Sequence, residues 1–300
     1  MALSSGPSVQ AVTFSSQGLK LAGTLYVPAR PGSSPVPAVV AGAGWGGTKD
    51  RGLVQFATRL VESGFAVLAI DYRGYGDSEG DRNRLYPLEQ TADLRSAVAF
   101  LRGREGIDRD RVAVLGVLTS AAAALQAASE DLGIRAVVGF FPFGDGERWM
   151  RSLRRGWEWR EFLKRIEADR ISRSLTGVSA LVDPNEILIR DPEGVEREER
   201  SRAATQARRD WKLGLDSADA ILAFKPEDHI HRIPPRSVML VAVEQDTLMP
   251  YEEVERLYAK LSEPKRLVTL RGIRHHDIYE PQRLTAVMTD VANFLQETTA

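Results

Sequence analysis

Short apolar runs alternate with stretches of helical length along the first half of the chain. The apolar runs are PAVVAGAG (37–44), FAVLAIDY (65–72), RVAVLGV (111–117) and RAVVGFF (135–141), and the helical stretches lie at 50–63, 87–104 and 119–130. Near-continuous runs of Val, Ile, Leu and Ala are typical of parallel strands that helices cover on both faces. The alternation therefore predicts an α/β fold with a mostly parallel sheet. Two further runs, at 8–15 and 19–27, predict an opening hairpin.

The same alternation returns after a long interruption. SVMLVAV (237–243) and KRLVTLRG (265–272) predict two more strands, with helices expected at 251–262 and 281–297. We therefore assign residues 1–142 and 231–300 to one α/β core.

The interruption, residues 143–230, differs from the core in composition. It contains four of the five tryptophans, many Arg and Glu residues at helical spacing and no convincing strand. A structureless loop of this length is uncommon in a compact domain, so we expect an inserted, mostly helical cap. Its tryptophans are expected in the core of the cap, and some of them around a substrate cavity. The charged run at 193–202 predicts a solvated helix face.

The composition excludes several kinds of chemistry. The chain has no cysteine, which rules out disulfides, a thiolate nucleophile and iron–sulfur clusters. With 40 basic and 41 acidic residues, it has no overall field that would attract nucleic acid or an anionic membrane. The first ten residues lack the features of a signal peptide, and no apolar run is long enough to cross a membrane. We therefore expect a cytoplasmic protein that binds a small molecule, and leave a homodimer open.

Several motifs directly follow predicted strands. GAGWGG (42–47) is a glycine loop that exposes backbone N–H groups, and LGVLTSAAAALQAA (115–128) is a strand, a sharp turn and a helix of small residues. EQDTLMP and GIRHHDIYE place Asp246 and His275 just after the last two strands. Because ligands of such sheets bind at the carboxyl ends of the strands, we expect these motifs to share one site.

Over nearly its whole length the chain resembles the α/β-hydrolase superfamily, in particular its capped branch related to dienelactone hydrolase and acyl-peptide hydrolase. The motifs above and GFAVLAIDYRGYGDSEG (64–80) carry this resemblance. It implies an α/β-hydrolase fold in which Asp246 is the acid and His275 the base of a catalytic triad. It also implies an oxyanion hole formed by the backbone N–H groups of Trp45 and Thr119.

The chain departs from the family at the nucleophile. The family's Gly-x-Ser-x-Gly elbow aligns with Gly116, Leu118 and Ser120, so a leucine stands at the serine position. No acyl-enzyme can form on Leu118. Four explanations stay open: a shifted nucleophile at Thr119 or Ser120, a substitution made in the laboratory, a catalytically inactive binding protein, and an enzyme that works without covalent catalysis.

We favour the last explanation, because a histidine oriented by an aspartate is a general base even without a serine. Together with N–H groups that stabilise a developing anion, such a base suits proton abstraction next to a carbonyl followed by loss of a carboxylate. We therefore expect a lyase that eliminates a carboxylate such as acetate from an O-acylated natural-product intermediate, with a mostly apolar substrate under the cap. A retained base without a nucleophile resembles the arrangement expected of the acetate-eliminating hydrolase-fold enzymes of tetronate and spirotetronate antibiotic biosynthesis. The alternatives are an esterase-type hydrolase using Ser120 or Thr119 and an inactive ligand-binding protein.

The remaining histidines are weaker candidates. The family pattern Gly-x-x-His aligns Gly272 with His275 and leaves His276 as its neighbour. His229 and His231 have the spacing of a metal-binding pair, but no third ligand accompanies them. We expect neither a metal nor a cofactor.

Overall fold

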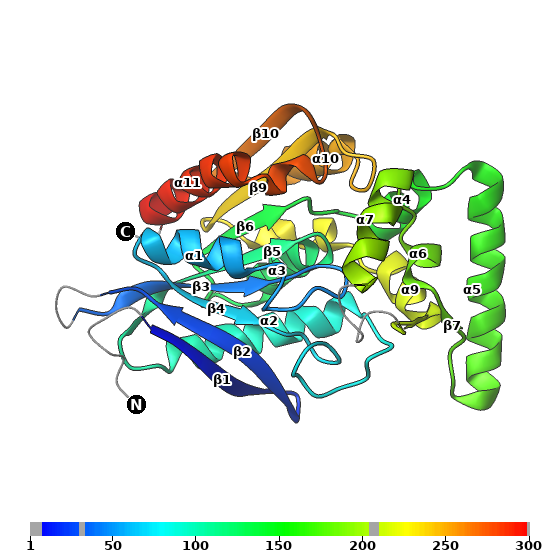
Figure 1. Ribbon diagram of the computed structural model, residues 1–300, viewed down its shortest axis with the longest axis horizontal. Coiled ribbons are helices and arrows are strands. Elements are labelled where there is room, and N and C mark those ends of the chain that lie inside the picture. The colour runs from blue at the N-terminus through cyan, green and yellow to red at the C-terminus, as the bar shows by residue number, and fades with distance from the viewer. Residues whose placement is uncertain (1–7, 30–33, 204–209, 299–300) are drawn as a thin grey trace.

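One eight-stranded sheet forms the centre of the computed structural model, which describes residues 8–29, 34–203 and 210–298 (Figure 1). Its strands are β1 (Ser8–Ser16), β2 (Leu19–Val27), β3 (Val36–Gly42), β4 (Ala66–Ile70), β5 (Ile107–Val117), β6 (Ala136–Phe140), β9 (Ser237–Gln245) and β10 (Lys265–Arg274). They lie in the order β1-β2-β4-β3-β5-β6-β9-β10. β2 runs antiparallel to β1 and β4, and all other pairs are parallel. The predicted opening hairpin and mostly parallel sheet are confirmed.

Helices cover both faces of the sheet, which explains why its strands are apolar without alternation. α1 and α11 contact each other on one face, and α2 and α3 contact each other on the other, while α10 packs against β9 (Figure 1). All residues of the central strands β4 and β6 are buried. The helix bounds are α1 (Val54–Glu62), α2 (Pro87–Arg102), α3 (Thr119–Glu130), α10 (Tyr251–Lys260) and α11 (Pro281–Thr298).

The inserted segment, residues 143–230, lies beyond the carboxyl ends of the parallel strands, and α5 is its outermost helix (Figure 1). Its described helices are α4 (Gly146–Ser152), α5 (Gly156–Thr176), α6 (Pro184–Ile187), α7 (Pro192–Ala203) and α9 (Leu215–Leu222), followed by the short 3₁₀ helices Pro226–Asp228 and Ile230–Arg232. The expectation of no strand is wrong in detail, because β7 (Leu181–Val182) and β8 (Leu213–Gly214) form a two-residue antiparallel pair. The composition could not predict this pair, because two residues carry no periodic signal.

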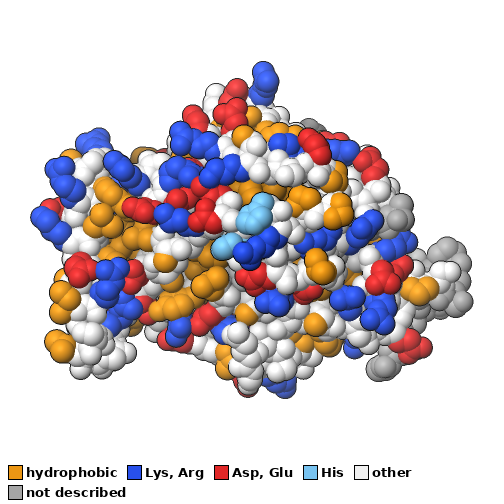
Figure 2. Space-filling view, turned by 180° about the vertical axis from the view of Figure 1, so that it is seen from behind, with side chains coloured by type: hydrophobic (Ala, Val, Ile, Leu, Met, Phe, Trp, Pro, Cys, Tyr) orange, Lys and Arg blue, Asp and Glu red, His pale blue; other side chains and the backbone are white. Residues whose placement is uncertain are grey.

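The tryptophans of the inserted segment have different surroundings. Trp149 is fully buried and stacks on Phe143 with ring centroids 4.6 Å apart, and Trp159 is also buried. Trp157 is 57 % exposed. Figure 2 shows hydrophobic side chains gathered on the side of the molecule where α5 stands, whereas acidic and basic side chains are interspersed over the rest of this view.

No helix among the described residues is long and apolar enough to cross a membrane. Residues 1–7, which make up most of the segment considered for a signal peptide, lie outside the described residues.

Candidate active site

Leu118 occupies a sharp turn between β5 and α3, with φ 52° and ψ −120°. A positive φ is rare for a leucine and strains the backbone, so the surrounding chain must hold it in place. Two neighbouring glycines make room for the turn. A Cβ on Gly44 would lie 2.8 Å from the Leu118 Cβ, and a Cβ on Gly116 would clash with the backbone of Ser120. The backbone therefore has the strained strand-turn-helix shape of a nucleophile elbow, although its side chain has no nucleophile.

The imidazole of His275 and the carboxylate of Asp246 are joined by a hydrogen bond of 2.7 Å between Nδ1 and Oδ2. Asp246 follows β9, and its Oδ1 accepts hydrogen bonds of 2.8 Å from the backbone N–H groups of Leu248 and Met249. The carboxylate is fully buried, and His275 is nearly so. A carboxylate bound at Nδ1 leaves Nε2 as the unprotonated nitrogen of the neutral ring.

Aromatic side chains fix the position of this pair. The ring of Phe141, at the carboxyl end of β6, lies 4.4 Å from the ring of His275. Trp149 donates a hydrogen bond of 2.9 Å from Nε1 to the carbonyl oxygen of Leu248, which anchors the Asp246 loop to α4. Trp149 of the inserted segment thus helps to position the loop that carries Asp246.

Both hydroxyls next to Leu118 have partners away from His275. The Ser120 Oγ lies 2.5 Å from the Tyr72 hydroxyl, and both residues are buried. Burial keeps the pKa of Tyr72 well above its ordinary value, so this is a contact between two neutral hydroxyls. The Thr119 Oγ1 accepts a hydrogen bond of 3.2 Å from the Trp45 N–H. The two residues assigned to the oxyanion hole thus contact each other in this structure.

A cavity of about 380 Å³ opens in front of His275. Its walls contain Leu118 from the elbow, Trp45 from the glycine loop and residues of α7. Neither Thr119 nor Ser120 is among the residues that line it, which are Gly44, Trp45, Gly47, Arg51, Gly52, Leu118, Arg190, Gly194, Arg197, Glu198, Leu248, His275, His276 and Tyr279. The lining is rich in charge, in contrast to the apolar enclosure that we expected.

The charged run at 193–202 is only partly the solvated face that its composition predicts. Arg197 and Glu198 contribute to the cavity wall, although the side chain of Arg197 is exposed, as are those of Glu196 and Arg200. A helix that covers a polar cavity needs no apolar stripe, so its charge pattern resembles that of a solvated helix.

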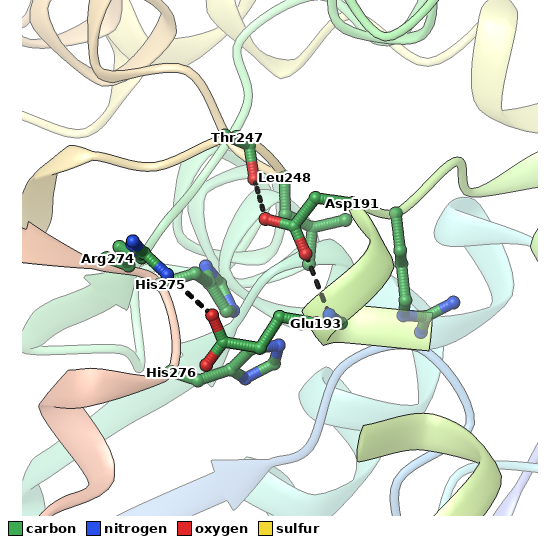
Figure 3. A pocket seen from close by; sticks show the side chains of 9 residues that line it. Asp191, Glu193, Thr247, Leu248, Arg274, His275 and His276 are labelled. Atoms are coloured by element: carbon green, nitrogen blue, oxygen red, sulfur yellow. Dashed lines mark hydrogen bonds and ion pairs between the residues drawn. The ribbon is translucent and has the colours of Figure 1, made fainter. Parts of the chain in front are cut away.

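The N-terminus of α7 is attached to both loops that carry the His–Asp pair (Figure 3). Asp191 accepts hydrogen bonds of 2.7 Å from the Thr247 hydroxyl and from the Gly194 N–H. Glu193 forms an ion pair of 2.7 Å with Arg274. Thr247 and Arg274 are the chain neighbours of Asp246 and His275, so α7 is positioned by the same loops as the candidate base.

His276 lies beside His275, with their rings 5.0 Å apart and nearly perpendicular. Burial, followed by repulsion from a proton on His275 and by the positive charges of Arg197 and Arg190, lowers the pKa of His276 to about 4. His276 is therefore neutral at neutral pH. In the described parts of the chain, no group of three His, Asp or Glu residues could hold a metal ion.

Sequence reasoning did not single out several residues of the cavity wall, among them Arg51, Arg190, Arg197, Glu198 and Tyr279. Tyr279 lies four residues after His275 in a 3₁₀ helix, Asp277–Tyr279, and its ring is 6.4 Å from that of His275. A sequence signal existed for Arg51, which closely follows the glycine loop, and for Tyr279, which lies in the GIRHHDIYE motif. The arginines near α7 become site residues only through the folding of the inserted segment.

The sheet topology, the elbow and the His–Asp pair at the carboxyl ends of the strands define an α/β-hydrolase-fold protein. The sequence pattern of one family within this class, Hydrolase_4, described as serine aminopeptidase S33, matches residues 34–282. The chain belongs to this family.

Related proteins cover most of the chain. An uncharacterized 31.7 kDa protein from the traX-finO intergenic region of Escherichia coli is 28 % identical over 278 residues, which are 91 % of this chain and 95 % of that protein. A protein named thiohydrolase from Eupenicillium brefeldianum is 26 % identical over 87 % of this chain and 85 % of its own. The crystal structure of the hypothetical protein PA2218 from Pseudomonas aeruginosa superposes with a TM-score of 0.83 and 24 % identity, over 99 % of this chain and 96 % of that one. The structural likeness supports the fold.

Proposed function

We propose that this protein is a lyase that eliminates a carboxylate such as acetate from an O-acylated molecule without a covalent intermediate. One observation carries the proposal: the His275–Asp246 hydrogen bond of 2.7 Å is intact while the elbow residue in the same cavity wall is Leu118. A base is retained where a nucleophile is absent. Sequence similarity to a protein named thiohydrolase supports an acylated substrate.

In the proposed reaction, Nε2 of His275 removes a proton from a carbon that a carbonyl system activates. The electron pair of that C–H bond forms a C=C bond to the neighbouring carbon, and the C–O bond to the carboxylate breaks. Asp246 stabilises the imidazolium that forms, and the proton returns to solvent when His275 is regenerated. Leu118 contributes an apolar contact where a serine would attack the ester.

Negative charge on the carbonyl oxygen would be stabilised by backbone N–H groups of Trp45 and Thr119. The first N–H groups of a helix have no partner within it, and Thr119 is the first residue of α3. The Trp45 N–H bonds a neutral hydroxyl at 3.2 Å, which an anionic oxygen would replace because charge-assisted hydrogen bonds are stronger.

The rival hydrolase would need Ser120 or Thr119 as its nucleophile. The Ser120 hydroxyl is fully buried and bonds Tyr72, and the Thr119 hydroxyl bonds the Trp45 N–H. Neither residue lines the cavity with His275. A second candidate function is hydrolysis of a thioester by a water that His275 activates directly, which the name of the thiohydrolase relative favours.

The test is to incubate the purified protein with an O-acetylated tetronate and to follow acetate and the alkene by mass spectrometry. Matched reactions use 4-nitrophenyl acetate, an acetyl thioester of N-acetylcysteamine and a serine-directed phosphonate. Alkene formation without a phosphonate adduct supports the lyase. A phosphonate adduct on Thr119 or Ser120 would establish the shifted hydrolase instead, and thioester cleavage without alkene would favour the second candidate. A ligand-dependent rise in Tm without any product would indicate a binding protein.

A further inference from the structure

The cavity in front of His275 has an excess of positive charge. Arg51, Arg190 and Arg197 line it, and Glu198 is the carboxylate among the residues that line it. His275 and His276 add no formal charge when neutral. The described wall of this cavity thus has a formal charge of +2, although the chain as a whole has a net charge of −1.

The three arginines differ in their engagement. Arg190 lies 3.8 Å from Glu198 and also donates to the amide oxygen of Asn185. Arg51 and Arg197 form no side-chain hydrogen bond or ion pair with any residue that the structure describes. Such isolation contrasts with Arg148, whose guanidinium binds both Glu227 and Glu253.

Arg51 and Arg197 reach the cavity from different parts of the fold. Arg51 belongs to the loop between β3 and α1, and Arg197 belongs to α7 of the inserted segment. The cavity that they line also contains His275 and Leu118. A ligand that bound both guanidinium groups would therefore connect the core to the inserted segment and lie beside the candidate base.

The electrostatics of His276 agree with a positive cavity. After burial, its pKa is lowered by repulsion from a proton on His275 and by the permanent positive charges of Arg197 and Arg190. The same field that disfavours a proton on His276 favours an anion in the cavity.

We propose that Arg51 and Arg197 bind a carboxylate of the substrate, so that the molecule acted on is an acylated compound that also carries an acid group. The guanidinium group presents N–H donors in a planar fork that fits the two oxygens of a carboxylate. That the bound molecule is a substrate rests on the proposed function. The binding of an acid group beside His275 does not depend on which reaction follows.

The test compares two probes of nearly equal shape, 4-phenylbutyrate and 4-phenylbutyramide, whose Kd values are measured by isothermal titration calorimetry. We expect the carboxylate to bind the wild-type protein roughly ten- to a hundredfold more tightly, the range typical of hydrogen bonds to a charged group. The double variant Arg51→Gln and Arg197→Gln should lose this preference. The control is Arg160→Gln on α5, an exposed arginine away from the cavity, which should retain it.

Equal Kd values for the two probes in the wild-type protein, or an undiminished preference in the double variant, would overturn the inference. A melting curve for each variant shows that it is folded before its Kd is compared. His275→Gln separates the inference from the proposed function, because it should abolish elimination and keep the preference for the carboxylate. Elimination from neutral substrates without that preference would leave the proposed function standing and remove this inference. A preference for the carboxylate without any elimination would support this inference and contradict the proposed function.

Discussion

The Nδ1 atom of His275 lies 2.7 Å from Oδ2 of Asp246, with the two side chains only 6 and 0 % exposed. The second oxygen of the carboxylate is held by two backbone N–H groups, so Asp246 has one orientation in which all three hydrogen bonds form. This arrangement fixes the tautomer of His275 and leaves its Nε2 as the available base.

Replacing His275 should abolish most of the elimination activity. His275→Gln removes the proton acceptor, and a positioned general base contributes on the order of 10²- to 10⁴-fold to a rate. We expect a fall in kcat of that size, measured as acetate released from an O-acetylated tetronate. The matched control is His276→Gln, which changes a neighbouring ring in the same cavity and should reduce kcat much less. Equal losses in the two variants would argue against the assignment of the base.

Asp246→Asn should inactivate the enzyme without unfolding it. The asparagine amide can donate to Nδ1 where the carboxylate accepted, which favours the His275 tautomer that carries its proton on Nε2. That tautomer cannot take a proton from substrate, and we expect kcat to fall by roughly 10²- to 10⁴-fold. The amide oxygen can still accept from Leu248 and Met249, so the Tm should change little. A large fall in Tm, with kcat proportional to the folded fraction, would assign Asp246 a structural role alone.

Leu118→Ser should create a serine that reacts with a phosphonate probe. The backbone at this position already has φ 52° and ψ −120°, and the side chain lines the cavity that contains His275. A hydroxyl there could give its proton to His275 and attack an ester. We expect covalent labelling of this variant, detected by intact mass, and none of the wild-type protein.

Ser120→Ala tests whether the Ser120 hydroxyl takes part in the reaction. It removes a hydroxyl that contacts Tyr72 behind the elbow, so it should leave elimination unchanged and lower the stability by about 1–3 kcal/mol because the buried Tyr72 hydroxyl loses its partner. Loss of activity without loss of stability would instead identify Ser120 as a reacting group.

The fold and the His–Asp pair could be predicted because each has a local signal. The Val-rich runs that become β3 to β6 are apolar on both faces, and Asp246 and His275 directly follow strands. The partners of Ser120 and Thr119 could not be predicted in this way. Tyr72 lies 48 positions from Ser120 and Trp45 lies 74 from Thr119, so only the packing of β3, β4 and α3 shows that these hydroxyls are occupied.

The cavity wall was missed for a related reason. The run that becomes α7 has no apolar stripe, and its position depends on two contacts over long sequence separations, Asp191 with Thr247 and Glu193 with Arg274. Charge patterning alone cannot distinguish a helix that faces water from one that faces a polar cavity.

Asp191→Ala should loosen α7 over the cavity. The change removes the acceptor of both the Thr247 hydroxyl and the Gly194 N–H at the start of the helix. We expect a loss of about 0.5–2 kcal/mol in the free energy of unfolding, as for other helix caps, and a rise in KM larger than the fall in kcat. The control is Glu196→Ala on the exposed side of α7, where the ion pair with Arg200 is 3.6 Å long and both side chains are 66 % exposed. An effect on kcat alone would show that Asp191 acts on the reaction rather than on the helix.

The stability of the protein should fall as the pH decreases from about 6.5 to 4, in part because of His276. Its pKa is about 4 in the folded protein, against 6.5 for an unperturbed histidine, mainly because of burial. Between these values the unfolded chain binds a proton that the folded protein does not, so acid favours unfolding. Allowing for the partial exposure of the ring, His276 should account for roughly 1–2 kcal/mol of the loss. We expect His276→Gln to flatten the dependence of the free energy of unfolding on pH in this window, as measured by urea denaturation at pH 7, 6, 5 and 4. The matched control is the same substitution at His231, which is exposed and lies outside the cavity. If the His276 variant follows the same curve as the wild-type protein, the lowered pKa assigned to His276 is wrong.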